Sequence, residues 1–318
     1  MIAVGIAALL VMVALVIDPT TYAQSVTNGL LLFVMSVLPS MLPFFFLSGL
    51  FIASGLAARI TSRTRWVGKL YHAPSDGAYV LLLSFLSGYP VGAKLTAELY
   101  EQGRIDTRGA KHLTAFTSAT GPMFVLGAVA GSILHDPRAG LCILAAHYLS
   151  ALLNGLLYRG KRQDYSFTPR ALPPVEMDRM LWDTACNTVL GLMVAGLYIT
   201  LFNVLADMAN QIGLWGLLVG LLEKMGANPA LSKGIVFGLT EMTRGCVELA
   251  GSGASIRIVA PLCCMLISFG GLCVALQSIA YLSKCKVNPL YYLLCKTTQG
   301  LLSLGLCFLF CLALPAAP

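Results

Sequence analysis

Apolar stretches longer than a bilayer is thick dominate this chain and leave few folds open to it. Several reach the roughly 17 to 25 residues needed to cross a hydrocarbon core about 30 Å thick. Hydrophobic residues make up 57% of the 318 residues and charged residues only 11%, against about 25% charged in soluble proteins. Backbone groups in lipid must be paired within their own segment, so the spans are predicted to be helices. The sequence therefore predicts an all-α polytopic membrane protein.

The net charge and the first apolar segment are also consistent with a membrane protein. The net charge is +7, but Lys and Arg lie in short loops between apolar segments, so they indicate topology and not nucleic-acid binding. The first segment, residues 1–17, lacks the basic start and small-residue cleavage site of a signal peptide, so it is predicted to be a span, with cleavage as the alternative. The other apolar segments are 28–56, 77–102, 112–134, 139–158, 186–206, 212–222, 229–250, 256–282 and 288–314.

Two of these segments are interrupted near their middle by Gly, Thr and charged residues, with a Pro in the first. SGYPVGAK at residues 87–94 interrupts segment 77–102, and TEMTRG at residues 240–245 interrupts segment 229–250. Neither segment reads as one continuous crossing. We call 77–102 the first hairpin and 229–250 the second hairpin, because each is predicted to turn back at its interruption.

The two interruptions correspond at a shift of 150 residues, which indicates an internal repeat. Lys94 falls opposite Arg244, and the correspondence continues downstream to Ser118 opposite Ser268. Similar apolar composition is the alternative explanation, and the shared basic-xxx-Glu-Leu element argues against it. Internal repeats are the common build of secondary transporters. The predicted parts are an extra helix and short outer loop (1–27), a first repeat (28–158), a basic cytoplasmic linker (159–177) and a second repeat (178–318).

Basic loops, which collect on the cytoplasmic side, give the orientation. Both flanks of the first hairpin are basic, so a full crossing would place them on opposite faces, whereas a re-entrant hairpin returns both to the cytoplasm. We therefore predict an inverted repeat with about seven full spans, two opposed re-entrant hairpins and an interfacial helix at 212–222. The N-terminus is expected inside and the C-terminus outside. The basic residues used are Arg59, Arg63, Arg65, Lys69, Arg104, Arg108, Lys111, Arg159, Lys161, Arg162, Arg170, Lys284 and Lys286.

Both hairpin tips are expected near the middle of the membrane. A first arm of about eleven residues reaches about 16 Å, half of the hydrocarbon core. Broken backbone at that depth requires burial in protein or a wet cavity. Two spans carry matching interruptions, which we call the first break (residues 117–122, TSATGP) and the second break (residues 268–271, SFGG). These breaks are predicted to flank a polar cavity between the tips.

Ionisable residues at membrane depth suggest a function for that cavity. Helix N-termini attract anions, and Lys94 and Arg244 lie where the second arms of the hairpins begin. The alternative is that Lys94 with Glu98, and Arg244 with Glu248, form i,i+4 ion pairs that stabilise those arms. The predicted substrate-binding residues are Ser87, Gly88, Tyr89, Pro90, Gly92, Lys94, Thr117, Ser118, Thr120, Thr240, Glu241, Thr243, Arg244, Gly245 and Ser268, with Glu98 and Glu248 as coupling or ion-pair residues.

Lone polar residues on apolar helices are weaker candidates, because they more often bond a neighbouring helix than a ligand. They are His147, Asn154, Asn203, Asp207 and Gln277. Ten cysteines lie without metal-ligand spacing and are interpreted as small hydrophobes. No phosphate-binding loop, metal signature or catalytic triad occurs, so we expect neither an enzyme nor a cofactor.

Four motifs resemble a known family. They are SGYPVGAK from Ser87, FTSATGPMFVLG from Phe116, HYLSALLNGLLYR from His147 and GLTEMTRG from Gly238. They resemble the YlbJ-type (SpoVV-type) sporulation integral membrane proteins of the nucleoside-recognition or Gate-domain group. The resemblance implies a fold like that of concentrative nucleoside transporters. It also implies transport of dipicolinate, a small aromatic dianion, across the outer forespore membrane of a spore-forming cell.

Three functions stay open at this point. The leading hypothesis is a transporter of a small organic anion, dipicolinate or another carboxylate. A nucleoside or nucleobase carrier is the second, for which neutral polar tips and stacking aromatics would be expected; Tyr89 is the one aromatic residue at a tip. The third is a non-transporting sporulation scaffold that uses the 159–177 linker for docking. The sequence leaves open the coupling ion, proton or sodium, and whether the protein forms a homo-oligomer.

Overall fold

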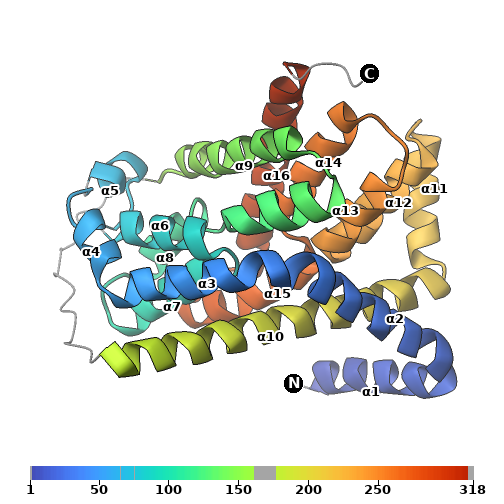
Figure 1. Ribbon diagram of the computed structural model, residues 1–318, viewed down its shortest axis with the longest axis horizontal. Coiled ribbons are helices and arrows are strands. Elements are labelled where there is room, and N and C mark those ends of the chain that lie inside the picture. Colours follow the sequence, from blue (N-terminus) through green and yellow to red (C-terminus); the bar gives the residue numbers. More distant parts are fainter. Residues whose placement is uncertain (1, 65, 75, 161–176, 314–318) are drawn as a thin grey trace.

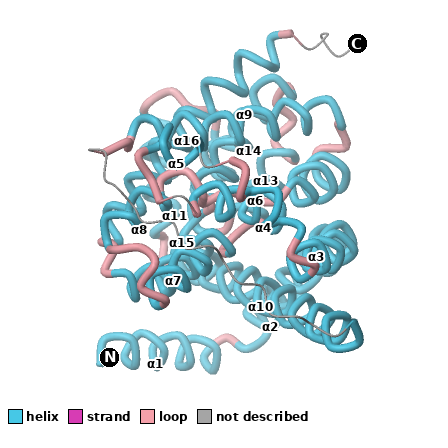
Figure 2. Tube along the Cα trace, turned by 90° about the vertical axis from the view of Figure 1, so that its left-hand side faces the viewer, coloured by secondary structure: helices cyan, strands magenta, loops and turns pink. Residues whose placement is uncertain are grey.

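Helices make up the regular structure of this chain. The computed structural model describes residues 2–64, 66–74, 76–160 and 177–313 (Figure 1), and within these ranges the elements are helices connected by loops, with no strands (Figure 2). The all-α prediction is therefore confirmed. Residues 161–176 of the predicted linker, the inside-loop residue Arg65 and the C-terminal residues 314–318 lie outside the described residues.

Five helices of the described residues are long and apolar enough to cross a membrane. Their mean hydropathy and length support a multi-pass membrane location. They are the continuous helix Pro19–Ala53, built from α2 (Pro19–Leu32), the π-helical η1 (Phe33–Val37) and α3 (Leu38–Ala53); α9 (Pro137–Leu157); α10 (Met177–Gln211); Ile256–Cys285, built from α14 (Ile256–Phe269), α15 (Gly271–Leu282) and η3 (Ser283–Cys285); and α16 (Pro289–Leu312).

Two of the seven expected spans are shorter in the structure. α1 (Ile2–Ile17) has 16 residues, and the segment 112–134 is divided between α8 (Thr107–Thr114) and the π-helical η2 (Phe124–Ile133). The short outer loop expected to complete residues 1–27 is also absent, since residues 19–27 are the first turns of α2. Asp18 caps that helix by accepting a hydrogen bond from Thr21 N, and Pro19 occupies its first position.

The first hairpin folds back on itself as α6 (Gly77–Ser87) and α7 (Val91–Glu101). Gly88 ends α6 with φ 75°, and a Cβ there would come within 2.7 Å of the Gly121 nitrogen, so glycine is required by both conformation and space. Asp76 and Arg104, which flank the hairpin, form an ion pair at 2.8 Å. Both ends of the hairpin therefore lie together.

The second hairpin folds back in the same way as α12 (Pro229–Thr240) and α13 (Met242–Ala250). Its two arms touch at glycines, because a Cβ on Gly245 would overlap the Cα of Gly238. Nearer the open end, Lys233 on one arm pairs with Glu248 on the other at 2.9 Å. Small residues at the contact let the two backbones approach closely, as in other membrane helix pairs.

Both predicted breaks are present. Residues 118–121 are not helical between α8 and η2, and Gly270 and Gly271, with φ of 89° and 67°, separate α14 from α15. The remaining helices are short: α4 (Leu56–Thr61), α5 (Trp66–Tyr71) and α11 (Leu214–Lys224), the last at the predicted interfacial segment.

The loops gather at two ends of the molecule. At the left of Figure 1, α4, α5 and α8 meet the end of α9, where Arg159 donates a hydrogen bond to the Leu70 carbonyl and Lys284 pairs with Glu101 at 2.9 Å. At the right lie α11, the start of α12 and the α1–α2 turn. Arg159 and Lys284, two of the basic residues that the sequence assigns to inside loops, therefore lie at this left-hand end.

The core is packed with small side chains from α9, α14 and α16. Ile143, Ala146, Cys264, Ile267 and Cys307 are fully buried there. Large apolar side chains on α1, α3 and α10 point outward instead, as a surface facing lipid requires. The polar groups described next lie inside this packed region.

We predict that the glycine contact is essential to the second hairpin. Gly245→Val forces a branched side chain against Gly238, and such overpacking lowers the free energy of unfolding by about 1–3 kcal/mol. Thermal unfolding of the protein in detergent measures this effect. Gly220→Val on α11 is the matched control, since a Cβ at Gly220 meets no atom within 4 Å. Equal stability of the two variants would contradict the prediction.

Candidate functional site

The two hairpin tips meet at the second break. Tyr89, at the tip of the first hairpin, donates its hydroxyl proton toward the carbonyls of Ile267 and Ser268, each at 3.3 Å. From the other side, the space beside Gly271 is closed by Thr240 and Met242 at the tip of the second hairpin. Segments far apart in the chain therefore converge on one place between α14 and α15.

His147 on α9 connects the two breaks. The N–H of Thr120 in the first break donates to Nε2 at 3.0 Å, which places the ring proton on Nδ1. Nδ1 lies 2.7 Å from Ser268 Oγ in the second break. The ring is fully buried. It therefore pairs a backbone N–H that the interrupted helix leaves without a partner, and fixes the position of both breaks.

Lys296 on α16 is a buried lysine of this region. Its side chain is 1% exposed. Its ammonium donates to Tyr89 Oη at 2.7 Å, to the Ser118 carbonyl at 2.7 Å and to Gln299 Oε1 at 2.6 Å. No carboxylate of the described residues lies within 4 Å of it. A buried ion without an opposite charge is unfavourable unless a partner compensates it.

Further polar side chains of α9 and α16 hold the first break. Asn154 donates to the carbonyls of Ala115 at 2.8 Å and Cys295 at 3.1 Å, and it accepts from Thr298 at 2.8 Å. The Tyr292 hydroxyl lies 3.2 Å from Ser118 Oγ. Backbone groups freed by the break are thus paired inside the protein, as they must be away from water.

Glu241 caps the second arm of the second hairpin. Its side chain, 1% exposed, accepts hydrogen bonds from Thr243 N at 3.0 Å, Thr243 Oγ1 at 2.9 Å and Arg244 N at 2.8 Å. The chain's own carboxylate therefore occupies the N-terminus of α13, where the sequence analysis expected a bound anion. The first hairpin differs, because α7 has no side-chain cap.

Arg244 faces α10, away from the tip. It pairs with Asp207 at 2.7 Å, donates to Asn203 Oδ1 at 2.9 Å and stacks 4.1 Å from the Phe237 ring. The i,i+4 pair with Glu248 is present at 3.9 Å. Of the two cations predicted to bind substrate, Lys94 is exposed on α7 and Arg244 is engaged by these acidic and amide groups.

The other predicted residues lie in or beside the breaks. Ser87 and Thr240 are buried at the ends of α6 and α12, and no partner is found for Thr240 Oγ1 within the described part of the chain. Thr117 bonds back to the Leu113 carbonyl at 2.8 Å. Pro90 is partly buried at the first tip, Gly92 packs against the Thr117 carbonyl, and Glu98 is partly buried on α7. Among the weaker candidates, Gln277 contacts Cys273 Sγ at 3.5 Å.

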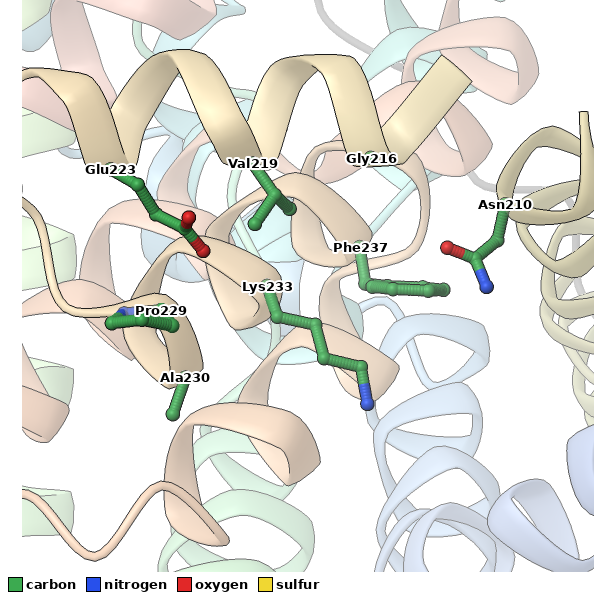
Figure 3. A pocket seen from close by; sticks show the side chains of 8 residues that line it. All are labelled: Asn210, Gly216, Val219, Glu223, Pro229, Ala230, Lys233 and Phe237. Atoms are coloured by element: carbon green, nitrogen blue, oxygen red, sulfur yellow. The ribbon is translucent and has the colours of Figure 1, made fainter. Parts of the chain in front are cut away.

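A separate cavity of about 360 Å³ lies between α10, α11 and α12 (Figure 3). Lys233 and Glu223 bring charges of both signs to its wall, and Phe237 separates it from Arg244. Its lining residues are Asn210, Gly216, Val219, Glu223, Pro229, Ala230, Lys233 and Phe237. Within the described ranges, no group of three His, Cys, Asp or Glu side chains could hold a metal ion.

Lys296, Gln299 and Tyr292 are the site residues that the sequence analysis missed. A signal for Lys296 was present: it is an ionisable residue inside the apolar segment 288–314, and such residues indicate function in membrane proteins. Its partners could not be read in the same way, because Tyr89 lies 207 positions away in the chain. The structure thus adds a buried lysine on α16 to the candidates, and substrate binding by Lys94 and Arg244 stays a prediction.

Similarity to a characterised membrane protein supports the family resemblance. The chain is 27% identical over 315 residues to the sporulation integral membrane protein YlbJ of Bacillus subtilis, covering 89% of this chain and 76% of that protein. The YlbJ-type resemblance is thereby confirmed, whereas the link to the nucleoside-recognition or Gate-domain group stays a prediction. No family model matches the chain. No solved structure matches it either.

We predict that Arg244 stabilises the fold through Asp207. Arg244→Ala leaves a partly buried carboxylate unpaired and lowers the free energy of unfolding by about 1–3 kcal/mol. The double variant Arg244→Ala/Asp207→Asn recovers part of that loss, because it removes the unpaired charge. Thermal unfolding in detergent measures both.

Arg179→Ala provides the control, since its pair with Asp183 is exposed and is expected to contribute about 0–1 kcal/mol. An Arg244→Ala protein as stable as the wild type would show that Arg244 has no such structural role.

Proposed function

We propose that this protein carries a small organic anion across a membrane during spore formation, with dipicolinate as the substrate. One observation carries the proposal: Lys296 is a buried lysine with no carboxylate partner among the described residues, and it lies where the first hairpin, both breaks and α16 meet. A carboxylate that enters this place would supply the missing negative charge.

The electrostatics favour an anion over a neutral ligand. Attraction between unit charges is several times stronger at a protein site of low effective dielectric than in bulk water. The second arm of the first hairpin, α7, begins without a side-chain cap, so the partial positive charge of its N-terminus adds to that of Lys296. At the second tip, the partial positive charge of the α13 N-terminus is already compensated by the Glu241 carboxylate. A neutral nucleoside would leave the ammonium charge uncompensated.

The architecture proposed from the sequence is compatible with this role. Arms of 11 and 12 residues reach about 16–18 Å, about half of a hydrocarbon core. The open end of the first hairpin lies at the basic end of the molecule and that of the second hairpin at the opposite end (Figure 1). We infer an inverted repeat with two opposed re-entrant hairpins, about seven spans, a cytoplasmic N-terminus and an external C-terminus.

Movement of one repeat against the other would give access to the site from each side in turn. The tips are held at the second break by hydrogen bonds and apolar contacts, which can exchange on movement. Tyr89 is the direct link between the first tip and both the second break and Lys296. Release of this link would open the site toward the end where the first hairpin begins.

Two observations connect the carrier to sporulation and to dipicolinate. The relative in Bacillus subtilis is a sporulation integral membrane protein, which supports a membrane role in sporulation here. The YlbJ-type resemblance suggests dipicolinate and the outer forespore membrane. Dipicolinate carries two carboxylates on a flat ring, so one can meet Lys296 while the ring lies against Tyr89.

We predict that liposomes containing the protein take up labelled dipicolinate and that Lys296→Met reduces this uptake tenfold or more. Attraction between unit charges about 4 Å apart is about 4 kcal/mol at an effective dielectric constant of about 20, more than the roughly 1.4 kcal/mol that corresponds to tenfold in affinity. Lys284→Met is the matched control, because the Lys284 side chain is 53% exposed and pairs with Glu101 at the basic end.

Uptake equal to that of empty vesicles would refute the proposal. Uridine that competes for uptake while benzoate and pyridine-2-carboxylate do not would favour the nucleoside carrier. If exchange of the 159–177 linker for an unrelated sequence abolished sporulation while Lys296→Met left it intact, the scaffold hypothesis would be preferred.

A further inference from the structure

Three oxygens from separate parts of the chain surround the Lys296 ammonium. Tyr89 Oη comes from the tip of the first hairpin, the Ser118 carbonyl from the first break, and Gln299 Oε1 from α16, at 2.7, 2.7 and 2.6 Å from Nζ. We call these three atoms the oxygen cage. Ser118 and Gln299 are both buried.

The acceptors of the cage suit a cation. The Tyr89 hydroxyl proton is directed to the carbonyls of Ile267 and Ser268, so Oη accepts from Lys296. The Ser118 carbonyl is an acceptor only, and Gln299 presents its amide oxygen. Three acceptors need three N–H donors, which an ammonium has and a neutral amine lacks. The cage is therefore complementary to a small positive ion.

Oxygens of this type at a broken helix bind free cations in other carriers. Unwound backbone carbonyls and the ends of half-helices coordinate the coupling ion of many secondary transporters. Carbonyl oxygens replace the hydration shell of such an ion. In this protein the ion's place between the first tip and the first break is taken by an ammonium that is covalently attached to α16.

We propose that Lys296 is a tethered cation that replaces a free coupling cation and joins the first hairpin to the first break. The part of this inference that concerns transport rests on the proposed carrier function. The part that concerns the cage does not, because it follows from the three oxygens alone. Transport is then independent of sodium and potassium, and removal of the lysine side chain leaves a vacant oxygen site that a monovalent cation can fill.

The decisive experiment is thermal unfolding of Lys296→Ala in detergent. The salts compared, at equal ionic strength, are choline, sodium, potassium and methylammonium chloride. The wild type is expected to unfold at the same temperature in all four. Lys296→Ala is expected to unfold at a lower temperature in choline and to regain several degrees, saturably, in at least one of the small cations.

Two variants test whether the response comes from the cage. Lys296→Met keeps the volume of the side chain filled, so it is expected to show no cation response. Lys296→Ala/Gln299→Leu removes one of the three oxygens, so its half-saturating cation concentration is expected to rise severalfold. A Lys296→Ala protein that responds to none of the cations, or a response that Lys296→Met shares, would overturn the tethered cation.

Uptake by the wild type gives a second measurement if Lys296→Ala does not fold. Replacement of sodium and potassium by choline on both sides of the liposome membrane is expected to leave dipicolinate uptake unchanged. Uptake that requires sodium or potassium overturns the inference. A cation response in Lys296→Ala without any wild-type uptake refutes the carrier function and still supports cation binding by the oxygen cage. The two hypotheses can therefore fail separately.

Discussion

Backbone groups at the two helix breaks must find partners away from water, and the interior of this protein is arranged around that requirement. An unpaired N–H or C=O group in lipid costs about 2–7 kcal/mol. α9 and α16 supply the partners: His147 pairs the Thr120 N–H, Asn154 pairs the Ala115 carbonyl, and Lys296 pairs the Ser118 carbonyl. The polar residues of these two apolar helices are thereby explained together.

The two hairpins resemble each other in backbone and differ in charge. In the second hairpin the helix after the tip begins with a carboxylate of the chain itself, Glu241, bound to its free N–H groups. In the first hairpin the corresponding helix has no cap, and the residue at the tip, Tyr89, meets a cation from another helix. Positive charge therefore lies at the first tip, from the uncapped start of α7 and from Lys296 of the second repeat, whereas a carboxylate lies at the second tip. The two hairpins therefore share a backbone arrangement but not the charged groups at their tips.

Local signals predicted the hairpins and breaks well, because Gly, Pro and charges inside long apolar runs are visible in a short window. Prediction of the site residues required contacts between residues that are far apart in the chain. Lys94 and Arg244 were chosen because they lie next to the interruptions, but a helix turns 100° per residue, so neighbours in sequence face different surroundings. Lys94 faces outward, and Arg244 meets Asp207 on α10. Lys296 gave a local signal, yet its partners became visible only when α16 was placed beside the first break.

The structure also indicates where relative movement would occur in a carrier of this kind. α10 packs along α2 and α3 at small residues, with Gly29 beside Thr200 and Gly196 beside Phe33, and these helices lie side by side along the lower edge of Figure 1. Close backbone contacts of this type resist sliding, so the pair acts as one unit. Arg244 provides polar links from the second hairpin to α10, through its partly buried ion pair with Asp207 and its hydrogen bond to Asn203 Oδ1. A partly hydrated ion pair can exchange its partner for water at a cost of about 1–3 kcal/mol, whereas backbones in close contact along a helix cannot slide without overlap. In a carrier of this kind, the hairpins and breaks would therefore be the part that shifts against α2, α3 and α10.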